Sequence, residues 1–524
     1  MQSAPPMSNS GTCRYITTAI PYVNAAPHVG FALEIVQADA LARFYRMSGD
    51  DVRFLSGTDE NSIKNVQAAD AAGAAVAELV ERNAAHFQAL RETLDLSFDD
   101  FIRTSADARH RPGAERLWNV CCENGDIYKR AYRGLYCTGC EQFYKPDELF
   151  DGRCPEHGTM PEEVEEENWF FRLSRYTDRL REIYARREIE IVPQSRRNEV
   201  LAWIEAGLED FSISRSAKRA RGWGIPVPGD PEQVIYVWFD ALANYITALG
   251  YGTNETLLSR YWREASSREH VIGKGIIRFH AVYWPAMLLS ARLRLPTRIL
   301  VHGYVTVEGR KIGKSAGNVI DPTPLAATFG TDALRYYLLR HIRSTEDGDF
   351  SQERFRQAYD SELAGQLGNL AHRVLSMVER YCDGFIPVPP VGFGESDRLL
   401  RSAAELPPTV AVHLQAFAFD RALDANWAFI AEANRYVSDE APWGLAKAAA
   451  SSDREAATAP EAQLHGTLFS LSASLLTVAK CIAPLLPGAS RKLFDKVGKS
   501  RHRTDLRALV GRRVEVGEPL FPKS

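Results

Sequence analysis

The sequence has few cysteines, no long apolar run and no large excess of charge of either sign. Eight cysteines among 524 residues are too few for a disulfide framework, so we expect a cytoplasmic protein. The uncharged stretch 466–479 is shorter than the roughly 20 residues of a membrane helix, so we expect no membrane partner. The 63 Lys and Arg residues against 67 Asp and Glu residues exclude a globally basic nucleic-acid binder, although a local basic face would suffice for RNA.

The remaining composition is that of a globular protein with several domains. Hydrophobic residues make up 45% and charged residues 25%, and at about 150 residues per domain we expect about three domains. Near the N-terminus, β-rich runs at 14–20 and 52–56 flank a helical pattern at 28–47, which indicates a parallel α/β sheet. A second strand-rich zone, with a helical pattern at 276–293, reads as the other half of the same sheet. Its strands are expected at 234–239, 270–272 and 299–307.

The last third of the chain has a helical pattern throughout. From Phe355 to Tyr381, apolar residues recur every three or four positions, which is the stripe of an amphipathic helix. Further helices are expected at 409–437 and 464–483, so this part predicts a helix bundle. We expect the first half of the sheet at 1–116, an insertion at 117–232 and the second half of the sheet at 233–320. A linking segment at 321–354 and a helical domain at 355–524 follow.

The insertion contains a cysteine and histidine cluster with metal-ligand spacing. Two short pairs of soft ligands can close a tetrahedron around zinc, and a two-residue gap lets a turn direct both side chains of a pair to one point. The pairs are Cys137 with Cys140, and Cys154 with His157. With four protein ligands and no open position, we expect a structural zinc site.

Two other features suggest anion binding. His28 follows Pro27 at the start of the first helical pattern, where free N–H groups attract an anion, and Gly30 permits close approach. Taken alone, a histidine at a helix start is usually only a cap. A basic loop with Lys311, Lys314 and Ser315 follows the last strand-rich run, and it lacks the glycine spacing of a P-loop. Its lysines could act as point charges on phosphates, although such a loop alone is usually a surface turn.

Together these two features resemble the nucleotide signatures of class I aminoacyl-tRNA synthetases. Further segments, in order from about residue 14 to about 450, narrow the resemblance to the methionyl-tRNA synthetase family, in its branch with one zinc knuckle. These segments are Ala19-Ile20-Pro21-Tyr22, Gly57-Thr58-Asp59-Glu60, Trp223-Gly224-Ile225-Pro226-Val227-Pro228, Val237-Trp238-Phe239-Asp240-Ala241 and His302-Gly303-Tyr304-Val305.

The resemblance implies a Rossmann-like catalytic domain split by the zinc-knuckle insertion, a stem-contact segment and a helical anticodon-binding domain. It also implies ATP-dependent activation of methionine to methionyl-adenylate and its transfer to the 3' end of tRNA(Met), for initiation and elongation. Magnesium accompanies the ATP. The implied catalytic residues are His28, Lys311 and Lys314, and the ATP site adds Gly30 and Ser315. The substrates supply the attacking groups, so no protein nucleophile is expected, and we expect a monomer.

The family's substrate-binding positions can be carried over residue by residue. The implied methionine pocket, in which Asp59 pairs with the substrate ammonium, consists of Ile20, Tyr22, Asp59, Trp238, Ala241, Leu242, Tyr245, Ile276 and His280. Aromatic and aliphatic walls suit a polarizable thioether. The implied anticodon readers are Asn369, Arg373 and Trp443, which can stack on and hydrogen-bond to single-stranded bases. By spacing alone, these residues are more often helix-face or core residues.

The sequence departs from the family pattern at four positions around the expected ATP site. Phe31 replaces a usual histidine, Gly275 replaces an aspartate that commonly binds the ribose, and Ile312 and Gly313 replace Met and Ser in the basic loop. The implied ATP contacts do not extend to these positions. Three alternatives stay open: a sister synthetase for another aliphatic amino acid, a small nucleotidyltransferase, and a non-catalytic tRNA-binding relative. The sister enzymes carry a much larger insertion, and nucleotidyltransferases lack a helical RNA-binding domain.

Overall fold

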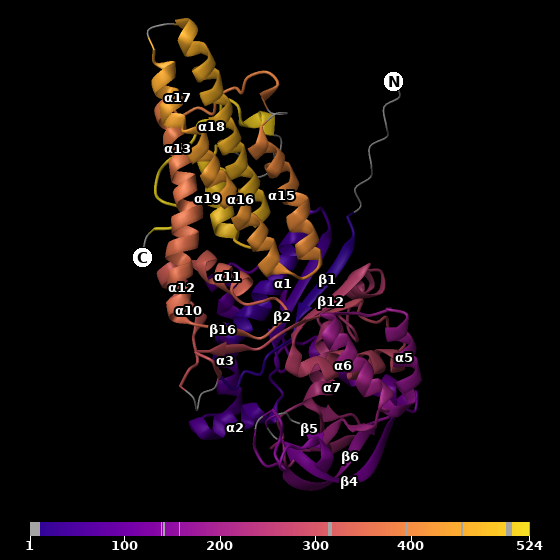
Figure 1. Cartoon of the computed structure of the whole chain (residues 1–524). Coiled ribbons are helices and arrows are strands. Elements are labelled where there is room, and N and C mark those ends of the chain that lie inside the picture. Colours follow the sequence, from indigo (N-terminus) through magenta and orange to yellow (C-terminus); the bar gives the residue numbers. More distant parts are fainter. Residues whose placement is uncertain are drawn as a thin grey trace, which may run out of the picture. The chain divides into compact units, whose positions relative to one another are not determined.

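The computed structural model describes residues 11–137, 139, 142–156, 158–312, 317–393, 397–451, 454–498 and 506–522 (Figure 1). The chain forms two compact units. The first consists of Met1–Ala38, Tyr45–Glu92 and Leu96–His302, and the second of Asp39–Phe44, Thr93–Asp95 and Gly303–Ser524. Each unit is described by itself. In the described ranges, no helix is both long and apolar enough to cross a membrane.

The first unit is built on a six-stranded sheet in which every neighbouring pair is parallel. The strand order is β3-β2-β1-β12-β13-β7. Their bounds are Asp100–Arg103, Asp51–Thr58, Cys13–Thr18, Ser267–Gly273, Arg298–His302 and Glu190–Val192. Strands from both predicted zones lie side by side in this sheet, with β1 paired to β12, so the predicted parallel α/β fold is confirmed.

Helix α1 (Val29–Met47) connects β1 to β2, as the N-terminal pattern predicts. The last four residues of β1 are buried, and nearly all of α1 up to Ala42 is buried too, because helices cover both faces of a parallel sheet. The carboxyl ends of β1, β2 and β12 therefore meet at one edge, where ligands bind in open α/β sheets.

The inserted segment forms antiparallel structure of its own. Strands β5, β4, β6 and β8 make a four-stranded sheet with bounds Gln142–Tyr144, Ile127–Cys137, Glu162–Phe171 and Phe211–Ser212. A three-stranded sheet, β10-β11-β9, follows with bounds Pro226–Val227, Asp230–Ile235 and Ser214–Ser216. Strand β7 also lies within the insertion, yet it pairs in parallel with β13 of the main sheet.

Two strand predictions were wrong in their extent. The run 234–239 is a strand only to Ile235, where β11 ends in the small antiparallel sheet, and Val237 begins helix α7 (Val237–Thr247). A continuous apolar run has neither helical nor strand periodicity, so its pattern cannot decide between them. The run 299–307 is divided between β13 and β14 (Val305–Val307). Between them, the backbone at Gly303 passes too close to Glu346 for any side chain to fit.

The second unit is mostly helical, as predicted. Its first long helical segment combines α12 (Gln352–Ala358), the π-helix η7 (Tyr359–Gly368) and α13 (Asn369–Tyr381). Seven of the eight predicted stripe residues are buried, and Tyr381 at the helix end is partly exposed. Helices α15, α16, α17, α18 and α19 pack as a bundle on this segment (Figure 1). Their bounds are Arg398–Gln415, Phe419–Glu440, Pro442–Ala449, Arg454–Ile482 and Pro487–Lys496.

The predicted single helix 409–437 is in fact two helices, α15 and α16. The break falls at Phe417, whose backbone adopts a left-handed conformation with φ 59°. Phe417 and Phe419 are both buried and meet edge to face at 4.9 Å. The apolar side chains that make the pattern look continuous therefore pack within the turn itself.

Candidate active site

His28 stands immediately before the first residue of α1 and is partly buried. Its Nδ1 accepts a hydrogen bond from the Gly30 backbone N–H at 3.1 Å, and its carbonyl accepts from the Phe31 and Ala32 N–H groups. Burial lowers the pKa of His28 below its ordinary value. A neutral ring that accepts at Nδ1 carries its proton on Nε2. His28 can therefore donate one hydrogen bond to an anion at the helix N-terminus, where the helix dipole adds to the attraction.

The predicted methionine-pocket residues belong to the first unit, and most of them are directly connected. The Tyr22 ring meets Trp238 edge to face at 6.4 Å, and Tyr22 pairs with Asp59 as an isolated β-bridge. Trp238 in turn meets the His280 ring at 6.2 Å. Ala241 and Leu242 lie on the same helix, α7, as Trp238. Ile20 follows β1 two residues before Tyr22.

A buried hydrogen-bond chain fixes the floor of this group. The Tyr245 hydroxyl lies 2.7 Å from His280 Nε2, and His280 Nδ1 lies 2.9 Å from the carbonyl oxygen of Ile276. Burial lowers the pKa of His280 to about 4, and it raises the pKa of Tyr245 well above its ordinary value. Since the neutral imidazole donates from Nδ1 to the carbonyl, its Nε2 accepts from the tyrosine hydroxyl. Both rings are therefore neutral at physiological pH, as a pocket for an uncharged side chain requires.

Asp59 provides the negative charge next to this uncharged pocket. It is 1% exposed and follows the end of β2, and its backbone N–H donates to the Pro21 carbonyl at 2.8 Å. The Asp59 backbone is thus paired with Tyr22 in the neighbouring strand extension. A buried carboxylate next to aromatic walls suits an ammonium group on an apolar ligand.

Glu34 and His302 form a second buried polar pair that the sequence did not predict as part of the site. Glu34 Oε2 lies 2.9 Å from His302 Nε2, at the carboxyl end of β13. Glu34 Oε1 is buried and has no hydrogen-bond partner among the described residues, so it can accept one from a ligand hydroxyl. One available signal was an acidic residue in the otherwise apolar stretch from 29 to 36.

The departures from the family pattern have different surroundings. Phe31 meets Phe87 edge to face at 5.1 Å and packs on an apolar cluster that includes Val23 and Val80. An aromatic ring in that position strengthens the packing but offers no hydrogen bond. Gly275 is exposed in a short helical turn, Lys274–Ile276, and Ile312 is partly exposed after β15 (Arg310–Lys311). Gly313 lies outside the described residues.

The basic loop begins at a short hairpin in the second unit. Lys311 lies in β15 (Arg310–Lys311), is exposed, and pairs with Thr306 of β14. Its ammonium lies 5.7 Å from the centroid of the Tyr304 ring. Lys314 and Ser315 lie outside the described residues. His28 belongs to the first unit and Lys311 to the second.

Half of the predicted zinc knuckle lies in the described range. Cys137 ends β4, and both Cys137 and Cys154 are 1% exposed, in a small cluster with Tyr144 and Leu149. Cys140 and His157 lie outside the described residues. Within the described ranges, no three His, Cys, Asp or Glu side chains gather closely enough to hold a metal. The two buried thiols in one cluster fit two of the three sulfur ligands of the predicted tetrahedral site.

The predicted anticodon readers all lie in the second unit. Asn369 is exposed at the start of α13, and Arg373 follows one turn later, partly buried. Trp443 is 49% exposed in the first turn of α17, and α17 packs against α13. An indole that is half exposed on a helix can stack on a base without unfolding its surroundings.

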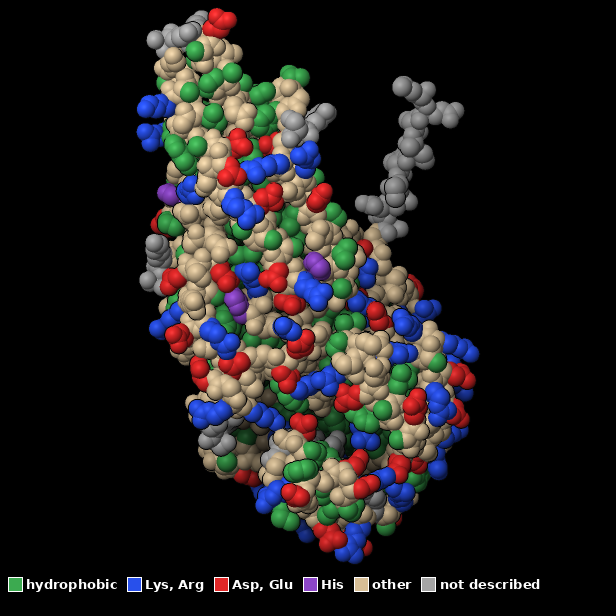
Figure 2. All heavy atoms as spheres, viewed as in Figure 1, with side chains coloured by type: hydrophobic (Ala, Val, Ile, Leu, Met, Phe, Trp, Pro, Cys, Tyr) green, Lys and Arg blue, Asp and Glu red, His purple; other side chains and the backbone are tan. Residues whose placement is uncertain are grey.

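On one face of the molecule, surface charges of both signs are interspersed rather than segregated. On the face seen in Figure 2, Lys and Arg side chains (blue) alternate with Asp and Glu side chains (red). This agrees with the formal net charge of −4 and with a nucleic-acid partner bound through local contacts.

A parallel sheet with a histidine-led helix at its ligand edge, followed by a helical bundle, agrees with the class that the sequence comparison gives, a class I aminoacyl-tRNA synthetase. The chain matches the family described as tRNA synthetases class I (M) over residues 14–160 and 144–375. It is 43% identical to the methionine–tRNA ligase of Mycobacterium bovis, over 97% of this chain and 96% of that protein. It is 41% identical to the methionine–tRNA ligase of Caldanaerobacter subterraneus, over 97% of this chain and 78% of that protein.

The solved structures agree with the sequence comparison. Mycobacterium tuberculosis methionyl-tRNA synthetase in complex with methionyl-adenylate superimposes with a TM-score of 0.90 at 42% identity, covering 97% of this chain and 99% of the other. The free-state structure of that enzyme gives a TM-score of 0.83 at 38% identity, covering 99% of each chain. The chain belongs to the methionyl-tRNA synthetase family.

Proposed function

We propose that this chain is a methionine–tRNA ligase. It would activate methionine with ATP, release pyrophosphate, and transfer the methionyl group to the 3' end of tRNA(Met) for initiation and elongation. One observation supports this proposal: the Tyr22 and His280 rings both contact Trp238, and Tyr22 is joined by a β-bridge to the buried residue Asp59. The membership of the chain in this family supports the same substrate.

The pocket suits methionine in both charge and polarizability. Asp59 would pair with the substrate ammonium, while Ile20, Tyr22, Ala241, Leu242 and Ile276 would surround the thioether with Trp238, Tyr245 and His280. Sulfur is polarizable and makes favourable contacts with aromatic rings. The neutral His280–Tyr245 pair would disfavour the binding of amino acids with charged side chains, because a buried charge without a partner is costly.

Activation would depend on electrostatic stabilisation and positioning. His28 would donate to the ATP phosphates, with Gly30 allowing their close approach. Lys311, Lys314 and Ser315 would bind the phosphates, and the two ammonium groups would stabilise the charge that develops on pyrophosphate. Magnesium bound with ATP would neutralise phosphate charge. The methionine carboxylate attacks the α-phosphorus, and pyrophosphate leaves with the electron pair of the broken P–O bond.

Recognition of tRNA would use the second unit. Asn369 and Arg373 would hydrogen-bond to anticodon bases and Trp443 would stack on one of them. In the insertion, Cys137, Cys140, Cys154 and His157 would hold a structural zinc ion. We further propose the catalytic halves at 1–116 and 233–320, the connective insertion at 117–232, the stem-contact segment at 321–354 and the anticodon-binding domain at 355–524. A cytoplasmic monomer fits the low cysteine content and the simple domain plan.

Amino-acid-dependent ATP–pyrophosphate exchange tests this function. Methionine alone should support exchange, and purified tRNA(Met) should then be charged. Exchange with leucine or isoleucine in place of methionine would point to a sister synthetase. Retained tRNA binding with no exchange for any amino acid would point to a non-catalytic relative.

A further inference from the structure

A fully buried carboxylate connects three elements around the pocket. Asp240 lies in the first turn of α7 and is 0% exposed. Its Oδ1 lies 2.5 Å from His110 Nε2, and its Oδ2 accepts from Asn61 Nδ2 at 2.7 Å. A carboxylate without solvent needs such partners on both oxygens. The interaction fixes Asp240 in direction as well as in position.

His110 holds α7 at two places. It opens helix α4 (His110–Glu123), and its Nδ1 lies 2.8 Å from the Thr247 hydroxyl. Asp240 and Thr247 are seven residues apart, so both lie on one face of α7. The imidazole contacts both residues, and all three side chains are fully buried. Helix α7 is therefore fixed against rotation and sliding relative to α4.

Asn61 connects α7 to the loop that carries Asp59. The residue between them, Glu60, is anchored separately: its N–H donates to Thr104 Oγ1 at 2.8 Å, and its carboxylate accepts from Arg103 at 2.7 Å. The loop is thus tied to the sheet through Glu60 and to α7 through Asn61.

We propose that Asn61, Asp240 and His110 are positioning residues that set the separation between the ammonium site and the thioether site. This inference rests on the proposed function. The ammonium partner, Asp59, lies two residues before Asn61, and four of the eight aliphatic and aromatic wall residues lie on α7. Apolar packing alone is non-directional, whereas hydrogen bonds to a buried carboxylate fix geometry. An amino acid with a side chain of the length of methionine can then occupy the ammonium site and the thioether site together. A longer amino acid can fit well in only one of the two.

The experiment measures ATP–pyrophosphate exchange with methionine and with ethionine, which is one carbon longer. Asn61→Ala should raise the methionine KM by roughly tenfold while leaving the ATP KM within about twofold, because a hydrogen bond to a charged group is lost. The ratio of kcat/KM for methionine to that for ethionine should fall. General damage to the fold would lower both values together and leave the ratio unchanged.

A charge swap keeps the test decisive if single variants fold poorly. Asn61→Asp places two carboxylates face to face and should be worse than Asn61→Ala. Combining it with Asp240→Asn restores a donor–acceptor pair at the same place, and it should recover most of the methionine KM and of the ratio. Asn426→Ala is the matched control, because Asn426 is also fully buried and donates to the Ala422 carbonyl, but in α16 of the second unit.

The outcomes separate this inference from the proposed function. Methionine-dependent exchange by the unaltered chain, with an unchanged KM and ratio in Asn61→Ala, would overturn the positioning role and leave the function intact. Failure of the swap to recover either quantity would also overturn it. No exchange with any amino acid by the unaltered chain would overturn both proposals.

Discussion

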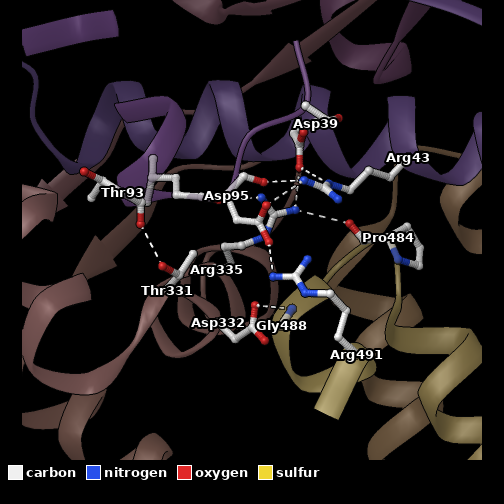
Figure 3. A network of polar contacts seen from close by, with 12 residues as sticks. Asp39, Arg43, Thr93, Asp95, Thr331, Asp332, Arg335, Pro484, Gly488 and Arg491 are labelled. Atoms are coloured by element: carbon white, nitrogen blue, oxygen red, sulfur yellow. Dashed lines mark hydrogen bonds and ion pairs between the residues drawn. The ribbon is translucent and has the colours of Figure 1, made fainter. Parts of the chain in front are cut away.

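The Arg335 guanidinium and the Asp39 carboxylate lie 2.8 Å apart, and both side chains are fully buried (Figure 3). Arg335 lies in α11 (Thr331–Arg340), and Asp39 is the residue with which α1 enters the second unit. The same guanidinium donates to the carbonyls of Leu485 at 2.8 Å, Leu94 at 3.0 Å and Pro484 at 3.2 Å. One side chain thus connects four segments of the chain that are far apart in the sequence.

Replacing Arg335 should destabilise the second unit strongly. In Arg335→Met, three buried carbonyls lose a donor, and Asp39 loses the ion pair with Arg335 while it keeps the one with Arg43 at 2.7 Å. Removal of one partner from a buried ion pair costs about 3–5 kcal/mol. We expect a clear fall in the melting temperature by calorimetry. Arg343→Met, which removes an exposed pair with Glu346, should change it little, and equal melting of the two variants would contradict this account.

Stability should fall in mild acid because of buried histidines. Well above pH 6.5, His280 is neutral whether the chain is folded or unfolded. As the pH falls toward 4, the unfolded form takes up a proton first, because burial lowers the folded pKa of His280 to about 4. The free energy of unfolding therefore falls by about 1.4 kcal/mol per pH unit from this group. Burial lowers the pKa of His270 as well, which adds to the effect.

His280→Gln should reduce the slope of the free energy of unfolding against pH by the contribution of about one proton. Denaturant unfolding at intervals between pH 4 and 6.5 would measure the slope. His86→Gln is the control, because His86 is exposed. Parallel curves for His280→Gln and the unaltered chain would show that His280 is accessible to protons in the folded state.

Trp443→Ala should separate the two steps of the reaction. Base stacking on an aromatic side chain is worth about 1–3 kcal/mol, so tRNA charging should lose roughly tenfold or more in kcat/KM. ATP–pyrophosphate exchange should be nearly unchanged, because no anticodon takes part in it. Val412→Ala removes another exposed apolar side chain of the second unit and should affect neither step. An equal loss of both steps in Trp443→Ala would contradict an anticodon role.

The basic loop should matter for chemistry rather than for amino-acid binding. Lys314→Ala should slow adenylate formation roughly a hundredfold, because removal of one preorganised charge or donor from a transition state commonly costs that much. The Kd for methionine in the absence of ATP should stay within about twofold. Lys492→Ala removes an exposed lysine from α19 and is the control. Loss of methionine binding in Lys314→Ala would show that the loop has a structural role.

The metal prediction can be checked on the purified chain. We expect about one zinc ion per chain by elemental analysis, and a large loss in Cys154→Ser, because a tetrahedral site needs all four ligands. Cys382→Ser changes a half-buried cysteine of the second unit and should leave the zinc content unchanged. Full zinc content in Cys154→Ser would exclude this set of ligands.

Local patterns predicted the parts of the fold that depend on local structure. Periodicity predicts the strand–helix–strand unit from β1 to β2 and the apolar stripe from Phe355 onward. The spacing of apolar residues along the sequence shows which face of a helix or strand is buried. The mixed run 234–239 and the break at Phe417 could not be resolved in the same way. In both cases the apolar and aromatic residues are compatible with more than one secondary structure, and tertiary packing determines which one forms.

The residues of the candidate site could be predicted where they belong to sequence motifs of the family. They could not be predicted where they are connected only by contacts between residues far apart in the sequence. Tyr22, Trp238 and His280 came from the family resemblance. The Asp240 pairs with Asn61 and His110 join residues 179 and 130 positions apart, and no periodic signal connects such positions. Glu34 showed only as an acid in an apolar stretch, and its partner, His302, is 268 residues away.

Strand β7 has a consequence for attempts to remove or transplant the insertion. This strand comes from the middle of the insertion and pairs with β13 at the rim of the parallel sheet. Deleting 117–232 as a cassette would leave the backbone of β13 as an open edge, ready to recruit a neighbouring chain. The insertion thus supplies the edge strand of the main parallel sheet. A shortened chain would need another strand paired with β13 to avoid self-association.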